Sequence, residues 1–319
     1  MRKREPDETV CPVCGIIHGS EEHPDFALKP GTLLHGGKYF VGRVLGQGGF
    51  GITYIGLDTT LEMKVAIKEY YPQTMAYRES GTTSLRWHSQ EIDRKTGRES
   101  FLKEARNMAK INQIPGVAQV KEIFYQNETA YIIMNFVEGE TLKAYLMRTG
   151  PMSEQRCFEL LGPVMESLME AHEAGMIHRD ISPDNIMIDK KGRVWVMDLG
   201  AAKDLDINHG SGAAMQSTRL VVRHGFSPLE QFSDGGRIGA WTDVYALAAT
   251  AYYCMTGKVL PDALNRMNED IEPESNGISP QLWKVLTKGM ELKPKDRYAT
   301  MQEFLDGWKE SRAERPAAG

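Results

Sequence analysis

Cysteine is scarce in this chain of 319 residues, which contains four. So few thiols in a large chain do not form the dense disulfide framework of small secreted domains. Cys157 and Cys254 lie in apolar helical patterns, which predict buried thiols. Long hydrophobic runs are also missing, because the longest, at residues 244–255, is too short to span a bilayer. The charged first eight residues do not lead into an apolar signal segment, so we expect a cytoplasmic protein without a membrane span.

A basic charge excess is absent as well. Lys and Arg number 38 against 43 Asp and Glu, which gives a net charge of −5 at pH 7. This balance offers no electrostatic reason for binding nucleic acid, and we expect no such partner. The length suffices for one large two-lobed domain or two ordinary ones, so the composition permits an enzyme.

Residues 1–32 form a polar segment with several prolines, which we interpret as a small appendage. Within it, Cys11 and Cys14 form a C-x-x-C-G turn that lets both thiolates face one tetrahedral Zn²⁺. His18 and His23 would complete a Cys₂His₂ site, although Cys14 and His18 are close in sequence for such a site. Two interpretations stay open: an intact zinc site, or a zinc knuckle formed by the two cysteines, whose other two ligands are missing or are supplied by a partner.

Periodicity divides the rest of the chain into a β-rich half and an α-rich half. Strands are expected at residues 39–45, 52–57, 64–70, 117–125 and 130–137, with a short hairpin near 85–88. Helices are expected at residues 100–111, 157–174, 242–255, 281–290 and 301–311. This order predicts an α+β fold with a smaller unit at 33–137, a larger helical unit at 138–312 and a polar tail at 313–319. A hinge and a ligand pocket are expected where the two units join.

The first strand ends in a sequence that fits G-x-G-x-x-G. Gly46, Gly48, Gly49 and Gly51 carry no Cβ, so backbone N–H groups can approach phosphate oxygens. A dinucleotide-binding turn would open into a helix, whereas residues 52–55 continue as a strand. The pattern therefore favours a hairpin that covers phosphates, with a plain glycine-rich turn as the alternative.

A lysine on the third strand and a glutamate on the following helix form the second motif. Lys68 ends the sequence V-A-I-K, and Glu104 lies in the predicted helix. An ion pair between them would hold the ammonium group against the α- and β-phosphates of a nucleotide. Either residue alone is more often a solvated surface charge, but the order of glycine loop, strand lysine and helix glutamate favours nucleotide binding.

The most specific motif is H-R-D-I-S-P-D-N at residues 178–185, followed after a short hairpin by D-L-G at residues 198–200. Phosphoryl transfer requires a carboxylate near the acceptor hydroxyl, and Asp180 supplies it. The reaction also requires oxygen ligands for Mg²⁺, which Asn185 and Asp198 supply. This arrangement, at this distance after a glycine loop and a strand lysine, rarely arises by chance.

On these motifs the chain resembles the eukaryotic-like protein kinase family from about Leu33 to Arg312. The segments G-G-F-G-I-T-Y, K-E-Y-Y-P and I-S-P resemble a bacterial branch of that family. The resemblance implies the two-lobed protein-kinase fold, with one main helix in the β-rich lobe. It also implies ATP and Mg²⁺ as cofactors, serine or threonine hydroxyls of protein substrates as acceptors, and autophosphorylation.

Further nucleotide-binding residues follow from the resemblance alone. Met134 resembles the gatekeeper residue, and residues 135–137 resemble the hinge that hydrogen-bonds adenine. Ala66 and Met187 resemble the roof and the floor of the adenine site. Beside the glycines and Lys68, the implied set is Leu45, Thr53, Ala66, Met134, Asn135, Phe136, Val137 and Met187.

The resemblance also assigns structural anchors. Residues 227–230 resemble an altered A-P-E end of the activation segment, and Arg297 resembles the arginine that pairs with Glu230. Asp243 resembles the helix aspartate that anchors the backbone of the catalytic loop. The segment between Lys68 and Glu104 is longer than in the family by about a dozen residues, which predicts an inserted hairpin or a mobile loop.

Two departures from the family pattern fall in one network. Ser182 stands where these kinases usually carry a lysine that contacts the γ-phosphate. Arg223 stands where they usually carry a threonine that links this lysine to Asp180. We predict a compensated exchange, in which the guanidinium group of Arg223 reaches Asp180 or the transferred phosphoryl group and serves in catalysis. The alternative is that Arg223 points to solvent and Ser182 makes the enzyme slow.

Two other classes of function stay open. A pseudokinase would act as a nucleotide-binding scaffold, but it would have no chemical need for the full set of phosphate, metal and base residues. A small-molecule kinase would share the catalytic-loop motif, whereas the long segment at 201–227 favours a protein substrate. The sequence leaves the oligomeric state open.

The activation segment carries three hydroxyl residues, Ser211, Ser217 and Thr218. A phosphate on one of them would pair bidentately with Arg179, beside the catalytic aspartate, and order the loop. The alternative is that they are ordinary polar loop residues.

Overall fold

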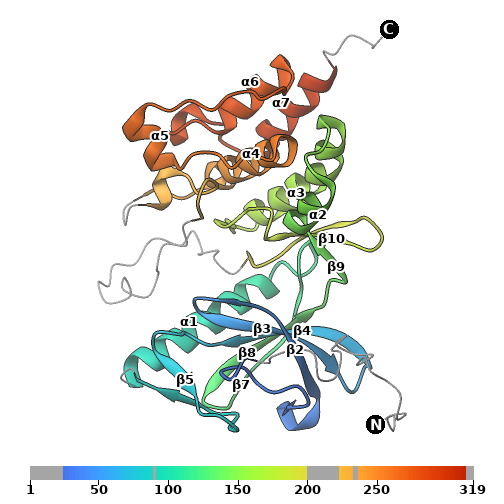
Figure 1. The fold of residues 1–319 in the computed structure, drawn as a ribbon, viewed down its shortest axis with the longest axis vertical. Helices are drawn as coiled ribbons and strands as arrows, with labels where there is room; N and C mark the ends of the chain where they lie inside the picture. The colour runs from blue at the N-terminus through green and yellow to red at the C-terminus, as the bar shows by residue number, and fades with distance from the viewer. Residues whose placement is uncertain (1–23, 89–90, 200–222, 233–235, 314–319) are drawn as a thin grey trace. The chain divides into compact units, whose positions relative to one another are not determined.

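The computed structural model describes residues 24–88, 91–199, 223–232 and 236–313. The chain divides into two compact units. Unit 1 contains Met1–Ala109 and Gln119–Phe136, and unit 2 contains Lys110–Ala118 and Val137–Gly319. Unit 1 is rich in strands and unit 2 is rich in helices, as Figure 1 shows.

A six-stranded antiparallel sheet forms the framework of unit 1, with the strand order β1-β2-β3-β4-β8-β7. Its strands are β1 (Leu33–Leu34), β2 (Tyr39–Gly48), β3 (Gly51–Asp58), β4 (Met63–Tyr70), β7 (Val120–Gln126) and β8 (Thr129–Asn135). The meander of β2, β3 and β4 confirms the strands predicted there. Helix α1 (Glu91–Ala109) packs against β7 and β8, and a separate hairpin pairs β5 (Ala76–Arg78) with β6 (Leu85–Trp87).

Strand β4 separates the core of unit 1 from the residues predicted to bind phosphate. Successive side chains of a strand point to opposite faces of the sheet. Val65 and Ile67 are buried in the hydrophobic core, and Glu69 follows them on the same face. Ala66 and Lys68 therefore face the other side.

The carboxylate of Glu69 is completely buried and accepts hydrogen bonds from three side chains. The hydroxyl of Tyr54 donates to Oε2 at 2.7 Å, and the hydroxyl of Tyr131 donates to Oε1 at 2.7 Å. Arg78 Nη2 also donates to Oε1. Burying a carboxylate is costly unless its oxygens find charged and polar partners, and here they do.

Arg78 ties this carboxylate to the N-terminal segment and to the β5–β6 hairpin. Its Nη1 atom donates to the main-chain oxygen of Phe26 at 2.6 Å, and its Nε atom donates to that of Thr83 at 3.1 Å. The N–H group of Leu28 donates to the hydroxyl of Tyr54 at 3.1 Å. We call Glu69, Arg78, Tyr54 and Tyr131 the Glu69 network.

Two elements of unit 1 differ from the sequence prediction. Helix α1 begins at Glu91 instead of residue 100, because its first turns are polar and show no apolar face; Ile92 there is 75% exposed. Strand β7 begins at Val120 instead of residue 117, because Val117 belongs to unit 2, where it forms a parallel bridge with Val196. The β5–β6 hairpin confirms that the long segment before Glu104 contains an inserted hairpin.

Unit 2 is organised around α4 (Ala240–Thr256), whose side chains are buried on nearly all sides. A helix that is apolar all round belongs in a protein interior. It is contacted by α3 (Glu154–Glu173), α6 (Pro280–Gly289) and α7 (Met301–Ala313), and the other α-helices among the described residues of this unit are α2 (Leu142–Thr149) and α5 (Ala263–Glu269). Cys157 of α3 and Cys254 of α4 are buried thiols, as predicted.

A small antiparallel sheet in unit 2 positions the loops that carry the catalytic motif. Its strand order is β11-β10-β9, with β9 at Gly139–Thr141, β10 at Ile186–Asp189 and β11 at Val194–Val196. The H-R-D motif lies just before β10, and Asp198 lies just after β11. The hairpin of β10 and β11 therefore brings the two parts of the motif together.

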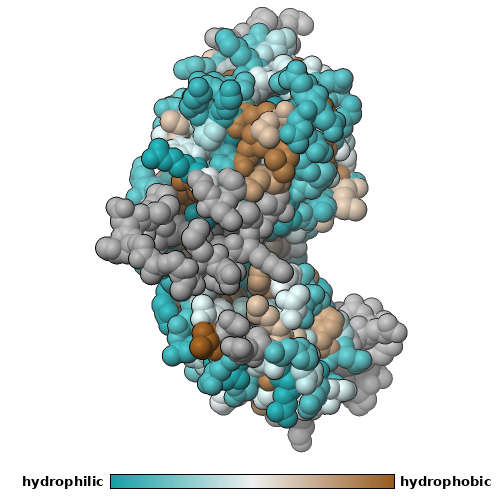
Figure 2. Space-filling view, turned by 90° about the vertical axis from the view of Figure 1, so that its left-hand side faces the viewer, coloured by the Kyte–Doolittle hydropathy of each residue, from teal (hydrophilic) through white to brown (hydrophobic). Residues whose placement is uncertain are grey.

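The surface shown in Figure 2 is mostly hydrophilic, with hydrophobic residues gathered mainly over the helical unit. Of the helices within the described ranges, none is both long enough and apolar enough to cross a membrane.

Candidate active site

The glycine-rich hairpin joins β2 to β3, where Gly48 and Gly51 pair across the turn. At Gly51 a Cβ atom would lie 2.7 Å from the carbonyl oxygen of Glu69, so only glycine fits. At Gly46, Gly48 and Gly49 a Cβ atom would meet no described atom within 4 Å, and none of them has a positive φ. The fold does not itself require glycine there, and the bare backbone suits close approach by a phosphate group.

The predicted lysine and glutamate both lie in unit 1. Lys68 lies in β4, where it pairs with Thr53 of β3 and Ile132 of β8. Glu104 lies in α1, the helix that packs on the same sheet. Each is partly buried and takes part in an interaction within the chain. Their assignment to phosphate binding stays a prediction.

The residues predicted to surround adenine belong to both units. Ala66 of β4 pairs with Met134 of β8, and both side chains are buried. The chain passes from unit 1 to unit 2 between Phe136 and Val137, so the predicted hinge is one of the covalent connections between the units. Met187 lies in β10 of unit 2. The other predicted nucleotide-binding residues lie in strands of unit 1: Leu45 in β2, Thr53 in β3 and Asn135 in β8.

Asp243 of α4 anchors the start of the catalytic loop, as predicted. The N–H groups of His178 and Arg179 donate to its two carboxylate oxygens at 2.8 Å each. The Nε2 atom of His172 lies 2.8 Å from Oδ2 of Asp243. Burial opposes ionisation of this carboxyl, but the hydrogen bond and the charge of His172 hold the pKa of Asp243 below its ordinary value.

The side chain of Asn185 holds Asp180 from within the loop. Its Nδ2 atom donates to Asp180 Oδ2 at 2.6 Å and to the main-chain oxygen of Asp180 at 2.7 Å. The Oδ1 atom of Asn185 accepts no hydrogen bond from the residues that the structure describes. The N–H group of Met197 donates to the carbonyl oxygen of Asn185 at 2.8 Å, which brings Asp198 close to it along the backbone. One amide oxygen and one carboxylate thus offer the ligands that Mg²⁺ prefers.

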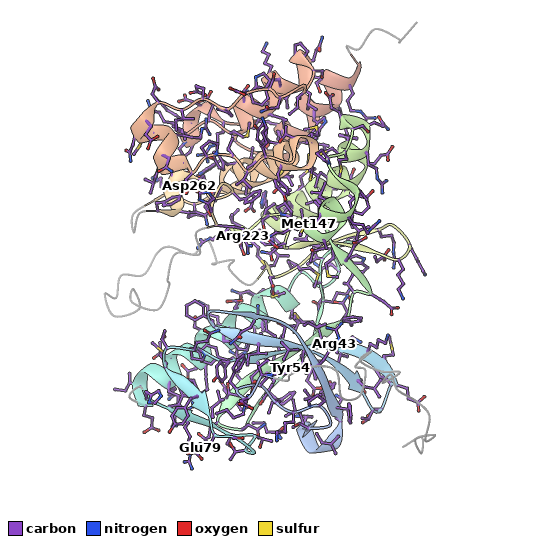
Figure 3. All side chains as sticks on the ribbon, in the orientation of Figure 1. Arg43, Tyr54, Glu79, Met147, Arg223 and Asp262 are labelled. Atoms are coloured by element: carbon purple, nitrogen blue, oxygen red, sulfur yellow. The ribbon has the colours of Figure 1, made fainter. Side chains whose placement is uncertain are left out.

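Arg223, which Figure 3 labels in unit 2, donates hydrogen bonds to two carboxylates of the catalytic loop in a forked arrangement. Its Nε and Nη2 atoms donate to the two oxygens of Asp180 at 2.8 and 3.0 Å, and its Nη1 atom donates to Asp184 Oδ2 at 3.0 Å. The hydrogen bonds to Asp180 raise the pKa of Arg223 above its ordinary value. The predicted contact with Asp180 is therefore present, and the alternative in which Arg223 points to solvent is wrong.

The predicted ion pair between Glu230 and Arg297 is confirmed. Arg297 Nη1 and Nη2 donate to the two carboxylate oxygens of Glu230 at 2.7 and 3.1 Å. Thr242 of α4 also donates to Glu230 Oε1 at 3.0 Å. This buried pair fixes the end of the activation segment to the helical core.

The segment from Arg223 to Glu230 has anchors that sequence reasoning missed. Ser227 Oγ accepts the N–H group of Arg223 at 2.8 Å. Asp262 accepts the N–H group of Gly225 at 2.7 Å and contacts His224 Nδ1 at 2.5 Å. Gly225 has φ of +76°, and a Cβ atom there would lie 2.5 Å from a carbonyl oxygen. Asp262 is distant in sequence and belongs to no motif, so no local signal marks it.

Two sets of predicted residues lie outside the described residues. They are the possible zinc ligands Cys11, Cys14, His18 and His23, and the activation-segment hydroxyls Ser211, Ser217 and Thr218. Elsewhere, within the ranges that the structure describes, no cluster of three or more His, Cys, Asp or Glu residues forms a metal site.

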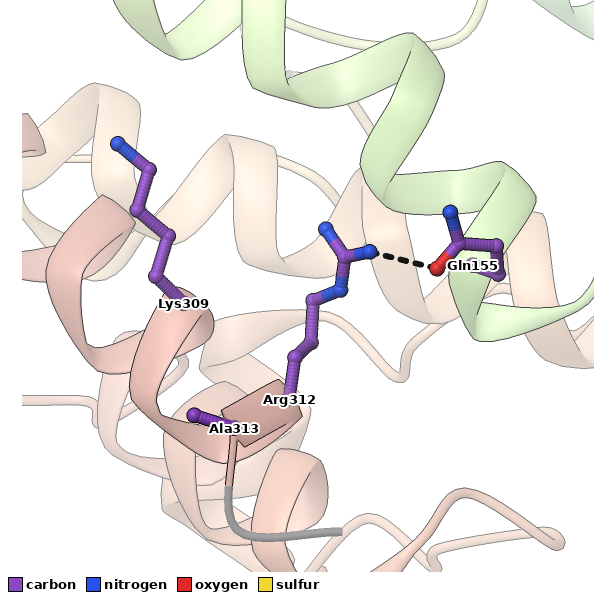
Figure 4. Close-up of a pocket in the computed structure, with 4 residues that line it drawn as sticks. All are labelled: Gln155, Lys309, Arg312 and Ala313. Carbon is purple, nitrogen blue, oxygen red and sulfur yellow. Dashed lines mark hydrogen bonds between the residues drawn. The ribbon is translucent and has the colours of Figure 1, made fainter. Parts of the chain in front are cut away.

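A shallow pocket lies at the end of α7, away from the residues of the motif. It is lined by Gln155, Lys309, Arg312 and Ala313, with a hydrogen bond of 2.6 Å from Arg312 Nη2 to Gln155 Oε1 (Figure 4). None of the predicted site residues lines it.

Comparisons with known proteins identify relatives of this chain. The family description that matches, over residues 39–308, is "Protein kinase domain". Serine/threonine-protein kinase F of Synechocystis sp. is 30% identical over 86% of this chain and 55% of its own length. Serine/threonine-protein kinase PknB of Mycobacterium tuberculosis is 28% identical over 84% of this chain and 42% of its own length.

A solved structure described as "PpkA-294 apo form" superimposes on this chain with a TM-score of 0.74. It is 31% identical, and the match covers 89% of this chain and 99% of that one. The fold is therefore the two-lobed protein-kinase fold, as predicted. The chain spans about half the length, or less, of the curated relatives named above.

Proposed function

The chain belongs to the protein kinase domain family, and from this membership we propose that it transfers the γ-phosphoryl group of ATP to serine or threonine hydroxyls of protein substrates. The names of its bacterial relatives support this choice of acceptor. The resemblance to a bacterial branch of the family, inferred from the sequence, agrees with these relatives.

One observation carries the proposal: the carboxylate of Asp180 is held at the centre of the catalytic loop by Asn185 and Arg223. In the reaction, the acceptor oxygen forms a bond to the γ-phosphorus. The bond from that phosphorus to the oxygen bridging to the β-phosphate breaks, and its electron pair leaves on ADP. The acceptor proton passes to Asp180 and then to solvent.

ATP and Mg²⁺ are the cofactors that this family uses, and the residues of the chain fit them. When bound, Mg²⁺ supplies positive charge that offsets the negative charge of the phosphates. Asn185 and Asp198 are the residues that would hold it. Lys68, positioned by Glu104, and the glycine hairpin would hold the phosphates, while Ala66, Met187 and the hinge would hold adenine.

Incubation of the purified chain with labelled ATP and Mg²⁺ tests the proposal. We expect label to enter a generic protein substrate and the chain itself, and not a panel of aminoglycosides and choline. The Asp180→Asn variant should bind nucleotide almost as well as the parent but lose about 10²–10⁴-fold in kcat, because this carboxylate acts on the acceptor and not on ATP.

Each alternative predicts a different result in the same experiment. A nucleotide-binding scaffold would bind ATP without transferring label, and a small-molecule kinase would label only the low-molecular-weight panel. Substantial turnover by the Asp180→Asn variant would contradict the role given to Asp180.

Phosphorylation of the activation segment is part of the proposed function. Burial lowers the pKa of Arg179, and its Nε atom has no hydrogen-bond partner among the described residues. A phosphate at Ser211, Ser217 or Thr218 would supply an acceptor. Mass spectrometry after incubation with MgATP should find phosphate in this segment; an active enzyme without it would remove autophosphorylation there.

The N-terminal appendage adds a proposed zinc site. Cys11, Cys14, His18 and His23 supply the ligand types of a tetrahedral Cys₂His₂ centre. Metal analysis should find one zinc ion per chain, lost when both histidines are replaced by alanine; zinc that persists would favour a knuckle completed in another way.

We also propose a cytoplasmic location, which the low cysteine content and the need for ATP support. Cell fractionation would check it.

A further inference from the structure

The cation nearest to the catalytic carboxylate in unit 2 comes from the activation segment and not from the catalytic loop. Arg223 contacts both oxygens of Asp180, at 2.8 and 3.0 Å. Its side chain is 32% exposed and that of Asp180 is 11% exposed, so solvent and a substrate can still reach the pair. The same guanidinium group also binds Asp184, which joins the two carboxylates of the loop through one side chain.

Ser182, two residues after Asp180, cannot supply a cation and does not reach a partner. Its side chain is completely buried, and its hydroxyl oxygen has no hydrogen-bond partner among the described residues. A buried hydroxyl without a partner is destabilising, so the fold has no structural need for this polar group. The position therefore contributes neither charge nor a contact to Asp180.

The pair of Arg223 and Asp180 can still form further hydrogen bonds. A guanidinium group has five N–H donors. Asp180 and Asp184 take three of those of Arg223, and the other two have no acceptor among the described residues.

The carboxylate of Asp180 can also accept a further hydrogen bond. A carboxylate offers about four lone-pair sites. Two are occupied by Arg223 and one by Asn185, which leaves one site on Oδ1. The acceptor hydroxyl can therefore hydrogen-bond to Asp180 without breaking the fork.

From this geometry we infer that Arg223 is the positioning residue of the phosphoryl-transfer centre: it orients Asp180 toward the acceptor hydroxyl and supplies the positive charge that Ser182 does not. The inference rests on the proposed function. As the bond from the acceptor oxygen to the γ-phosphorus forms and the bond to the leaving oxygen of ADP breaks, negative charge develops on the transferring group. A fixed cation beside Asp180 stabilises this charge, and the proton still passes from the acceptor to Asp180.

The competing interpretation is an inhibitory lock, in which the fork must open before Asp180 can act. It predicts the opposite sign for the loss of Arg223, since removal of a lock raises activity. A purely structural role is a third interpretation, and it predicts a loss of folded protein instead of a loss of turnover.

Three variants separate these interpretations. Arg223→Ala removes both the forked hydrogen bonds and the positive charge, whereas Arg223→Lys keeps the positive charge but not the fork. Arg193→Ala is the matched control. Arg193 makes a similar contact in the same unit, with its Nε atom 2.8 Å from Asp189 Oδ2. We expect Arg223→Ala to lower kcat about a hundredfold, with the KM for ATP changed only a few-fold. The kcat of Arg223→Lys should lie between those of Arg223→Ala and the parent, and the kcat of Arg193→Ala should equal that of the parent.

A binding measurement gives a readout that does not depend on turnover. MgADP with aluminium fluoride mimics the transferring phosphoryl group, so the parent should bind it more tightly than MgADP alone. Arg223→Ala should bind MgADP like the parent but lose most of the gain from aluminium fluoride. Thermal unfolding of each variant checks that it is folded, and millimolar guanidinium should restore part of the activity of Arg223→Ala.

The double variant Ser182→Lys with Arg223→Thr tests the exchange directly. It should recover activity relative to Arg223→Ala, with strong non-additivity of the two changes because both sites act on one carboxylate.

The possible failures are distinguishable. A parent that transfers no phosphate overturns the proposed function, and this inference falls with it. An active parent whose Arg223→Ala variant is equally active overturns only the inference. A more active variant shows a lock, and a variant that loses kcat only in proportion to its folded fraction shows a structural role.

Discussion

Two carboxylate–arginine pairs in this chain have the same chemistry and opposite surroundings. Glu69 and Arg78 in unit 1 are sealed from solvent, with side chains 0% and 1% exposed. Asp180 and Arg223 in unit 2 are 11% and 32% exposed. Each guanidinium group donates three hydrogen bonds to described residues, one from each of its nitrogens, so the two pairs differ in their exposure to solvent and not in the number of these bonds.

This difference in exposure to solvent, and not the ion pair itself, separates a structural role from a chemical one. A buried pair is strongly destabilising only when one partner is lost, because the other is left charged and unpaired. An ion pair that solvent can reach, and whose carboxylate has a lone pair to spare, can accept a substrate without rearrangement. The Glu69 network therefore holds strands and the N-terminal segment together, and the pair of Asp180 and Arg223 is available for catalysis.

The largest effect on stability should follow from breaking the sealed pair. We expect Arg78→Ala to lower the free energy of unfolding by about 3–5 kcal/mol, because Glu69 keeps its buried charge and loses its cation. The same change at Arg223 should cost about 1 kcal/mol or less, since Asp180 is closer to solvent. Denaturant unfolding measures both values.

A control in the same hairpin sharpens this prediction. Arg86→Ala removes an arginine that is 65% exposed and lies 3.7 Å from Glu79, so its effect should stay within about 0.5 kcal/mol. Equal losses for Arg78→Ala and Arg223→Ala would contradict the distinction between a sealed and an open pair.

The sequence predicted one of these pairs and not the other, for a physical reason. The pairing of Asp180 with Arg223 follows from motif positions, which a family resemblance carries over residue by residue. Glu69 lies in the segment K-E-Y-Y-P, whose resemblance to a bacterial branch assigned no role to it, and a glutamate in a strand is usually exposed. Its burial depends on tyrosines from two other strands and on Arg78 from an inserted hairpin, which no local pattern relates.

The secondary structure likewise contains elements that the sequence predicts and elements that it does not. Strands β2 to β4 and helices α4 and α6 were predictable to within about three residues, because their apolar periodicity is strong. The first turns of α1 were not, since Glu91 to Arg98 shows no apolar face. The predicted roles of Lys68 and Glu104 remain predictions.

A smaller effect should follow from removing one hydroxyl of the Glu69 network. Tyr54→Phe deprives Glu69 Oε2 of a donor and Leu28 N–H of its acceptor, so we expect a loss of about 2 kcal/mol at neutral pH. Activity should be nearly unchanged. Denaturant unfolding measures the stability, and transfer of label from ATP to a protein substrate measures the activity.

The pH dependence of this variant gives a second test. Burial, and then the charge of Glu69, raise the pKa of Tyr54 above its ordinary value. Above about pH 10 the unfolded chain releases this proton and the folded chain does not, so the parent loses stability as the pH rises. Tyr54→Phe lacks this loss, and its deficit relative to the parent should narrow between about pH 9 and 11. A deficit that widens over this range would contradict a neutral, buried Tyr54; Tyr77→Phe controls for the loss of a hydroxyl at the surface.

The smallest effect is expected at Lys143, which shares Asp184 with Arg223. Its Nζ atom lies 3.2 Å from Asp184 Oδ1, and the two side chains are 48% and 36% exposed. Lys143→Ala should lower stability by less than about 1 kcal/mol, and high salt should abolish the difference, because solvent screens such a pair. Without Lys143, Asp184 keeps Arg223 as its partner, so the fork on Asp180 stays in place and kcat should change less than about twofold. Steady-state kinetics of Lys143→Ala, Asp184→Asn and the double variant measure the coupling. A loss approaching that of Arg223→Ala would mean that the charge near Asp180 is shared between two cations, and the positioning role assigned to Arg223 would extend to Lys143.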